Sequence, residues 1–223
     1  MEETNTPEHR LNVPEKDLPI TPTTREEIEQ DTRERIHHIS KEFQEGFSLV
    51  NNYQTSVSFF GSARFDKSHH YYQTARSLAH RIVSELGYTI VTGGGPGIME
   101  AANRGAKEAG GASLGLGIDL PNEQALNEYV TDYVNFHYFF VRKVLLAFSA
   151  EAYVFFPGGF GTHDEFFELI TLVQTKKIAP VPLVCVGSEY WNRFDSFIHD
   201  ELAARQVIDG NDVNLYTVTD TEQ

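Results

Sequence analysis

The chain has 223 residues, of which 40% are hydrophobic and 22% are charged, a length and composition that fit a soluble globular protein with one sizeable core. Its net charge of −14 repels the phosphates of nucleic acids and excludes general binding to DNA or RNA. A single cysteine, Cys185, excludes an intrachain disulfide. Since the sequence has no long apolar span and no signal peptide, we expect a cytoplasmic protein that does not bind membranes.

The N-terminal region divides into a polar segment and a helix. Residues 1–24 are polar and interrupted by prolines, so we expect a flexible segment there, followed by a single domain over 25–223. Thr23 and Glu26 have the spacing of a capping box. Apolar residues then recur at helical spacing up to Val50, which predicts a long amphipathic helix ahead of the main fold.

From Ser56 onward, strand-like and helix-like segments alternate. The predicted strands are 57–60, 88–92, 113–118, 152–156 and 181–186, and the predicted helices are 72–86, 98–109, 138–149, 165–177 and 190–204. The strands are almost continuously apolar, which is typical of a parallel sheet covered on both faces. We therefore predict an α/β fold, a Rossmann-like doubly wound parallel sheet flanked by helices, with an N-terminal helical extension.

The first glycine-rich turn, residues 93–97, follows a predicted strand and precedes a predicted helix. Gly94, Gly95 and Gly97 would let the backbone approach a ligand closely. The turn is not a Walker A loop, because no Gly-Lys-Ser/Thr follows, and Glu100 stands where a dinucleotide fingerprint has its third glycine. A purely structural role for these glycines remains open.

The second glycine-rich turn, residues 156–165, has the layout of a phosphate site. It connects an apolar strand to a predicted helix, whose first N–H groups attract an anion. Thr162 supplies a further donor, and Glu165 places a carboxylate beside whatever the turn holds. The alternative for Glu165 is an ordinary acid at a helix N-terminus, favoured there by the helix dipole.

Together these residues resemble the Lonely Guy family of cytokinin-activating phosphoribohydrolases. The P-G-G-x-G-T-x-x-E motif of that family is present from Pro157 to Glu165, its Arg-Lys pair is Arg142-Lys143, and its glycine turn with a methionine spans residues 93–99. The resemblance covers roughly residues 56–202. One departure is His163, which occupies a position where the family commonly has leucine or methionine.

The resemblance implies cleavage of the N-glycosidic bond of a purine nucleoside 5′-monophosphate, cytokinin-type or AMP-like, giving the free base and ribose 5-phosphate. It assigns catalysis to Arg142 and Glu165, needs no cofactor or metal, and implies a homodimer or an assembly of dimers. Carried over residue by residue, its further substrate contacts are Glu123, Lys143, Gly158, Gly159, Phe160, Gly161, Thr162, His163, Asp164 and Thr171.

The chemistry fits these residue types. Cleavage passes through an oxocarbenium-like state, which a carboxylate at Glu165 can stabilise or for which it can orient the attacking water. The guanidinium of Arg142 is charged at any relevant pH, and it can hold the phosphate or assist the departing base.

Rival hypotheses come from other classes. The same fold can serve as a non-catalytic nucleotide sensor, although a sensor needs no carboxylate beside the glycosidic bond. A metal site is disfavoured, because its candidate ligands His163, Asp164 and Glu168 lack the usual spacing. Relatives were once labelled lysine decarboxylases, but a pyridoxal enzyme needs a Schiff-base lysine and a site for the cofactor ring, and no segment of this sequence indicates either. Arg142, Lys143 and Thr171 can also be read as ordinary helix-surface residues.

Overall fold

The computed structural model describes residues 24–53, 55–119 and 126–220. By their internal contacts the residues form two units, 1–37 and 38–223, and the boundary falls inside helix α1 (Arg25–Val50). Apart from Thr24, the predicted flexible segment 1–24 lies outside the described residues.

Helix α1 begins one residue later than the sequence predicts. Thr24 and Glu27 form the capping box: the Glu27 carboxylate accepts from the Thr24 N–H at 2.7 Å, and the Thr24 hydroxyl accepts from the Glu27 N–H at 3.3 Å. The predicted pair, Thr23 and Glu26, has the same spacing because both residue types are doubled in the sequence, so spacing alone could not choose between them. In the second unit, the C-terminal half of α1 packs Phe43 and Phe47 against the core.

One parallel sheet organises the second unit. Its strands are β1 (Ser56–Phe60), β2 (Thr89–Thr92), β3 (Ser113–Ile118), β4 (Asp132–Phe136), β5 (Ala152–Phe155), β6 (Leu183–Val186) and β7 (Thr217–Thr219). Their order is β4-β3-β2-β1-β5-β6-β7, and every neighbouring pair is parallel.

The sequence did not predict the two edge strands, β4 and β7. Edge strands bury few residues, and in β4 only Phe136 is buried, so neither segment has the apolar run that marks the central strands.

The helices are α2 (His70–Arg81), extended by a π-helical turn (Ile82–Leu86), α3 (Ile98–Glu108), α4 (Phe139–Ala147), α5 (Phe160–Gln174) and α6 (Ser188–Phe197), extended by a second π-helical turn (Ile198–Ala203); a short 3₁₀ turn (Asp212–Asn214) precedes β7. Gly87 ends the α2 segment in the left-handed conformation, at φ 72°, as the sequence predicts. The prediction that α5 begins at Glu165 is wrong. It begins five residues earlier, at Phe160, because residues 160–164 of the glycine motif already adopt helical geometry.

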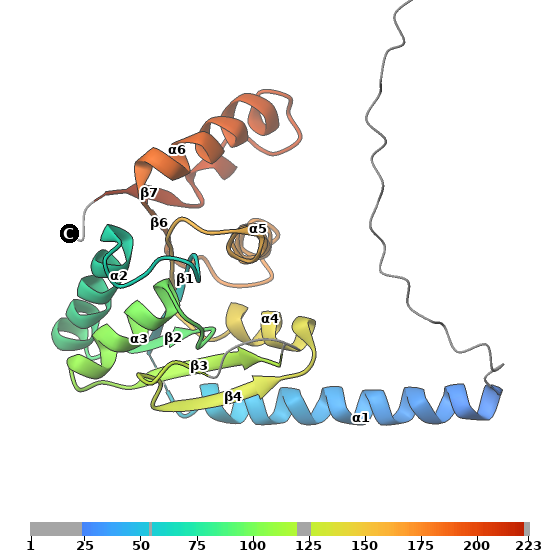
Figure 1. Cartoon of the computed structure of the whole chain (residues 1–223). Coiled ribbons are helices and arrows are strands. Elements are labelled where there is room, and N and C mark those ends of the chain that lie inside the picture. Colours follow the sequence, from blue (N-terminus) through green and yellow to red (C-terminus); the bar gives the residue numbers. More distant parts are fainter. Residues whose placement is uncertain (1–23, 54, 120–125, 221–223) are drawn as a thin grey trace, which may run out of the picture. The chain divides into compact units, whose positions relative to one another are not determined.

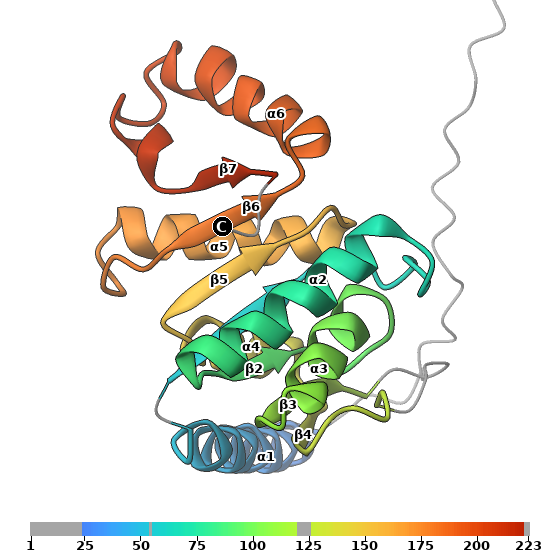
Figure 2. The same cartoon turned by 90° about the vertical axis from the view of Figure 1, so that its left-hand side faces the viewer.

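Helices cover both faces of the sheet (Figures 1 and 2). Neighbouring residues of β1 show this directly: Phe59 packs into the cluster under α2 and α3, and Phe60 packs into the cluster under α4 and α5. All five residues of β1 are buried, its two serines included, as expected for a strand covered on both faces. The predicted doubly wound α/β fold is confirmed.

The order in which the chain adds strands to the sheet reverses beside β1. The chain winds outward from β1 to β4, then returns to place β5 on the other side of β1. In such sheets, ligands bind outside the carboxyl ends of the strands at the point where the order reverses. The loops that follow β1 and β5 therefore lie at the expected ligand position, and Ser62 N–H donates to Pro157 C=O across them at 3.0 Å.

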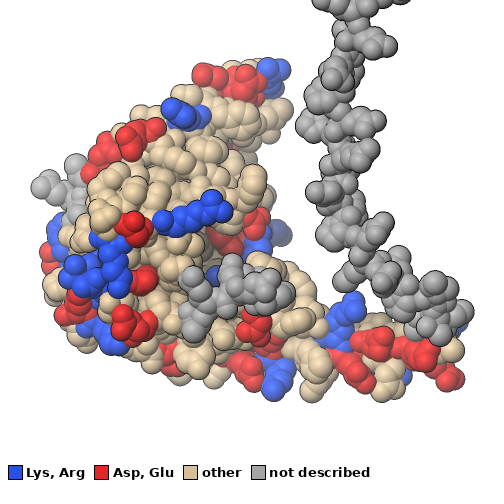
Figure 3. Space-filling view, in the orientation of Figure 1, with Lys and Arg blue, Asp and Glu red and all other residues tan. Residues whose placement is uncertain are grey.

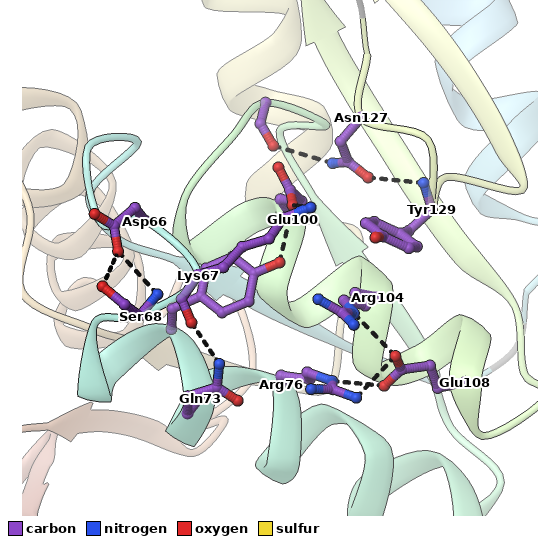
Figure 4. Close-up of polar contacts among 12 residues, drawn as sticks. Asp66, Lys67, Ser68, Gln73, Arg76, Glu100, Arg104, Glu108, Asn127 and Tyr129 are labelled. Carbon is purple, nitrogen blue, oxygen red and sulfur yellow. Dashed lines mark hydrogen bonds and ion pairs between the residues drawn. The ribbon is translucent and has the colours of Figure 1, made fainter.

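Lys and Arg side chains gather over α2 and α3, interleaved with acidic side chains (Figure 3). Arg76 of α2 and Arg104 of α3 both contact the Glu108 carboxylate, at 2.6 and 2.9 Å (Figure 4). Glu100 accepts a hydrogen bond from the Tyr72 hydroxyl at 2.9 Å and pairs with Lys67 at 3.2 Å. Glu100, which stands where a dinucleotide-binding motif has its third glycine, thus joins α3 to α2.

Within the described parts of the chain, no helix combines the length and the apolar character that crossing a membrane requires.

Candidate active site

A cavity of about 1420 Å³ opens at the carboxyl edge of the sheet, over the point where the strand order reverses. Its walls are the two glycine turns, the loop after β1, the end of β3, one face of α4 and the first turn of α6. Among the predicted site residues, the following line it: Gly94, Gly95, Arg142, Gly158, Gly159, Phe160, Gly161, Thr162, Asp164 and Glu165.

The first glycine turn is built for close packing as well as for ligand approach. Gly97 has φ +70°, and a Cβ there would overlap the Ser62 carbonyl oxygen, which accepts a hydrogen bond from Ile98 N–H at 3.1 Å. Gly97 is not among the residues that line the cavity, and its contact with Ser62 gives it a structural role. At Gly93, a Cβ would overlap the guanidinium of Arg142, so that glycine makes room for the predicted catalytic arginine.

Two asparagines that the sequence analysis missed hold this turn in place. The Asn127 Nδ2 lies 3.0 Å from both the Gly94 and the Gly95 carbonyl oxygens and 2.9 Å from Asn103 Oδ1, while the Asn127 Oδ1 accepts from Tyr129 N–H (Figure 4). Asn103 is fully buried on α3. Its place on the otherwise apolar face of that predicted helix was the one signal available, since a buried amide must be hydrogen-bonded.

The second glycine turn presents the start of α5 to the cavity. Gly159 caps the helix without a side-chain bond, and His163 N–H makes the first backbone bond, to Gly159 C=O at 3.2 Å. The N–H groups of residues 160–162 precede that bond and are left without intrahelical partners. A Cβ at Gly159 or Gly161 would meet nothing within 4 Å, so this rim is open. An anion can therefore approach the unbonded N–H groups.

Glu165 is a buried carboxyl at the floor of the cavity. It lies in the second turn of α5, with 7% of its surface exposed, and its Oε2 has no hydrogen-bond partner among the described residues. Burial raises the pKa of Glu165 to about 8; nearby Glu168 adds to the shift, and Lys143 and Arg142 oppose it. The reading as a first-turn acid favoured by the helix dipole does not fit, because the first turn of α5 contains no acid.

Arg142 projects from α4 into the same cavity. Its Nε donates to the Leu116 carbonyl at 2.7 Å, which ties the guanidinium to the end of β3 above Gly93. Both Arg142 and Glu165 line the cavity, so the two predicted catalytic residues are brought together, and the positive charge of Arg142 opposes the rise in the pKa of Glu165.

Lys143, next in sequence, contacts acidic side chains of α5. Its ammonium contacts Asp164 at 2.8 Å and Glu168 at 3.4 Å, and so it joins α4 to α5. Lys143 does not line the cavity, and its effect on the site runs through the charges around Glu165.

Two other predicted contacts do not line the cavity. Thr171 is exposed on α5 and donates to the Phe167 carbonyl at 2.7 Å. His163 points away, towards α6, where its Nε2 lies 2.7 Å from the Tyr190 hydroxyl. Glu123 lies outside the described residues.

Over residues 24–53, 55–119 and 126–220, no group of three or more His, Cys, Asp or Glu side chains is arranged to hold a metal ion.

Some residues of the cavity wall were not predicted from the sequence. Arg64 in the loop after β1, Asp119 and Asn135 at the β3–β4 edge, and Tyr190 on α6 all line it. They belong to segments far apart in sequence and carry no motif.

A family model described as "Possible lysine decarboxylase" matches residues 99–223, more than half of the chain. The chain belongs to this family. It is the Lonely Guy family under its older label, as the motifs around Arg142 and Glu165 indicate.

Relatives within the Lonely Guy family are distant. The chain is 28% identical over 134 residues to a cytokinin riboside 5′-monophosphate phosphoribohydrolase of Arabidopsis thaliana, a match that covers 59% of this chain and 62% of that protein. It is 28% identical over 121 residues to the enzyme of the same name in Rhodococcoides fascians, covering 52% of this chain and 60% of that protein. The chain thus spans less than two thirds of the length of these two relatives.

Solved structures share the fold of this Lonely Guy member. One is the molybdenum cofactor carrier protein of Chlamydomonas reinhardtii, with 24% identity, a TM-score of 0.53, and coverage of 74% of this chain and 89% of that chain. A second structure of the carrier protein from that organism has 25% identity and a TM-score of 0.50, and the match covers 74% of this chain and 88% of that chain.

Proposed function

We propose that the protein hydrolyses the N-glycosidic bond of a purine nucleoside 5′-monophosphate, AMP-like or cytokinin-type, to release the free base and ribose 5-phosphate. The observation that carries this proposal is Glu165, a buried carboxyl that faces the cavity beside Arg142 and has an unpartnered oxygen. Two family relatives whose names describe this activity support the reaction class.

The raised pKa of Glu165 gives it a defined role. With a pKa of about 8, the carboxyl holds a proton at neutral pH, so it can donate that proton to the departing nitrogen of the base. The carboxylate left behind then faces the positive charge on the ribose. Water adds to the anomeric carbon, and its surplus proton returns to Glu165, which restores the starting state.

The unbonded N–H groups at the start of α5 are the proposed phosphate site. They lie at a helix N-terminus, where the helix dipole also favours an anion, and they come three to five residues before Glu165 on the same helix. Arg142 adds a fixed positive charge in the same cavity, which a protein of net charge −14 needs for an anionic substrate.

The second candidate is a non-catalytic binding protein, since the solved structure at 25% identity that shares this fold is a molybdenum cofactor carrier protein. A carrier gains nothing from an unpartnered buried carboxyl, which lowers the stability of the fold at neutral pH. The label of lysine decarboxylase has less support: none of the described residues that line the cavity is a lysine, and Lys143 is paired with two carboxylates.

The test is incubation with a panel of nucleosides and their 5′-monophosphates, scored for free base and ribose 5-phosphate. We expect turnover only with the 5′-phosphate, and Glu165→Gln should reduce kcat by about two powers of ten or more while nucleotide binding persists. Equal turnover of nucleosides, or binding without any cleavage by the parent protein, would contradict the proposal, and the second result would favour the carrier.

A further inference from the structure

A tyrosine from α6 is hydrogen-bonded to the backbone of the second glycine turn. The hydroxyl of Tyr190 donates to the Gly158 carbonyl at 2.6 Å, and the same oxygen lies 2.7 Å from His163 Nε2. The two rings are parallel, at 3° and with centroids 5.8 Å apart, and Trp191 and Phe194 pack around them. His163 occupies a variable position of the family motif, and Tyr190 lies outside the motif.

The direction of both hydrogen bonds follows from the atoms available. A carbonyl oxygen has no hydrogen, so the single hydrogen of the Tyr190 hydroxyl must point to Gly158. His163 Nε2 must then carry a hydrogen and donate to the tyrosine oxygen. The other ring nitrogen, Nδ1, is buried without a partner, which suits a neutral imidazole, and burial lowers the pKa of His163.

The carbonyl held in this way belongs to a peptide between two glycines. Neither glycine has a side chain to restrict rotation; a Cβ at Gly159 would meet nothing within 4 Å, although at Gly158 it would overlap the Thr162 side chain. If this peptide turned, its carbonyl oxygen could face the opening where the N–H groups of α5 lie. A carbonyl dipole in that position would repel an anion.

We propose that His163 and Tyr190 form a two-bond relay that fixes the Gly158 carbonyl and so keeps the start of α5 ready for a phosphate. Both are positioning residues. The bond from His163 polarises the tyrosine hydroxyl and strengthens its bond to Gly158. This inference rests on the proposed phosphate site but not on the hydrolysis of any substrate.

The first test compares Tyr190→Phe with Tyr153→Phe. Tyr153 is a matched control, because its buried hydroxyl also donates to a backbone carbonyl at 2.6 Å, that of Ala147, and it does not line the cavity. The dissociation constants of inorganic phosphate and of AMP are measured by calorimetry. We expect Tyr190→Phe to weaken both by about 2- to 13-fold, the value of one such hydrogen bond, and Tyr153→Phe to leave both unchanged.

The second test separates positioning from direct contact with the ligand. Tyr190 lines the cavity but His163 does not, so a loss in His163→Leu that acts through the tyrosine should disappear once the Tyr190 hydroxyl is removed. We expect about 2- to 5-fold weaker phosphate binding in His163→Leu, recovery in His163→Gln, and no further loss when His163→Leu is added to Tyr190→Phe. In turnover assays KM should rise while kcat changes less than about threefold.

The outcomes are distinguishable. Unchanged phosphate and AMP binding in Tyr190→Phe overturns the relay, and so does additivity of the two substitutions. A parent protein that binds no phosphate overturns both the relay and the phosphate site. A parent that binds phosphate but cleaves no nucleotide overturns the proposed hydrolase alone, and the relay is still decided by the binding data.

Discussion

Single residues in this protein show a conflict between stability and chemistry, most clearly at Glu165. A carboxyl held at 7% exposure without a partner for one oxygen is stable only while it stays protonated. The unfolded chain releases that proton near pH 4.5, whereas the folded protein keeps it up to about pH 8. Between these two pH values the native state binds a proton that the unfolded state does not.

The first prediction concerns stability. Because the folded pKa of Glu165 is raised, its stabilising contribution is complete below about pH 4.5 and is lost as the pH rises towards 8. Glu165→Gln, which cannot ionise, should match the parent near pH 4 and exceed its free energy of unfolding by about 4 kcal/mol at pH 8. Urea unfolding of both proteins across this range measures the difference. Parallel stability curves would contradict the burial of an ionisable Glu165.

The second prediction concerns the pH dependence of catalysis. If Glu165 donates its proton to the departing base, kcat/KM should fall as the pH rises through about 8 in the free enzyme. A rate that instead rises through this pH would mean that the carboxylate is the active form and that it orients water. The residual activity of Glu165→Gln should show neither the fall nor the rise near pH 8, because glutamine does not ionise.

At the scale of elements, the turns at the carboxyl edge act as one unit. The loop after β1 is bonded to both glycine turns through Ser62, whose N–H donates to Pro157 C=O and whose C=O accepts from Ile98 N–H. Asn127 and Asn103 brace the first turn from the opposite side. The shape of the cavity therefore depends on hydrogen bonds between segments far apart in sequence, and a substitution in one glycine turn should also displace the other.

The third prediction tests this coupling with a pair of glycines. Gly97 and Gly110 both have positive φ, +70° and +77°, but only at Gly97 would a Cβ overlap the backbone of another loop. Gly110→Ala should cost only its backbone strain, about 1 kcal/mol, whereas Gly97→Ala should cost at least about 2 kcal/mol more and weaken phosphate binding. Thermal unfolding and phosphate titration measure the two effects. Equal losses in both variants would mean that the contact with Ser62 is unimportant.

At the scale of the whole molecule, apolar side chains left in contact with water favour an assembly. Phe140 and Phe148 at the two ends of α4 are 50% and 53% exposed, and large exposed apolar groups commonly mark protein interfaces. A homodimer with the site near its subunit contact is the arrangement that the family resemblance implies. We propose Phe140 and Phe148 as part of that subunit contact.

The fourth prediction is that the protein sediments as a dimer or a larger even-numbered assembly at micromolar concentration. Phe140→Asp together with Phe148→Asp should shift it towards the monomer, because a charge in an apolar interface is not compensated. Phe197→Asp, a change at a side chain that is 47% exposed on α6, is the control and should leave the assembly unchanged. A parent protein that sediments as a monomer would rule out this interface.

The sequence by itself determined the parts of this protein that depend on local order. The apolar runs of β1, β2, β3, β5 and β6 predicted a parallel sheet, and the glycine motifs predicted where its ligand edge would be, because periodicity and turn chemistry are properties of neighbouring residues. Arg142 and Glu165 were found in the same way, through their motifs.

Tertiary structure alone decided what depends on residues far apart in the chain. The edge strands β4 and β7 form by pairing with neighbours rather than by their own apolar character. The raised pKa of Glu165 comes from its burial among groups on two helices, and the roles of Gly97 and His163 come from their contacts with Ser62 and Tyr190. Burial and hydrogen-bond partners are set by the packing of distant segments, and so a motif could name these residues without giving their positions.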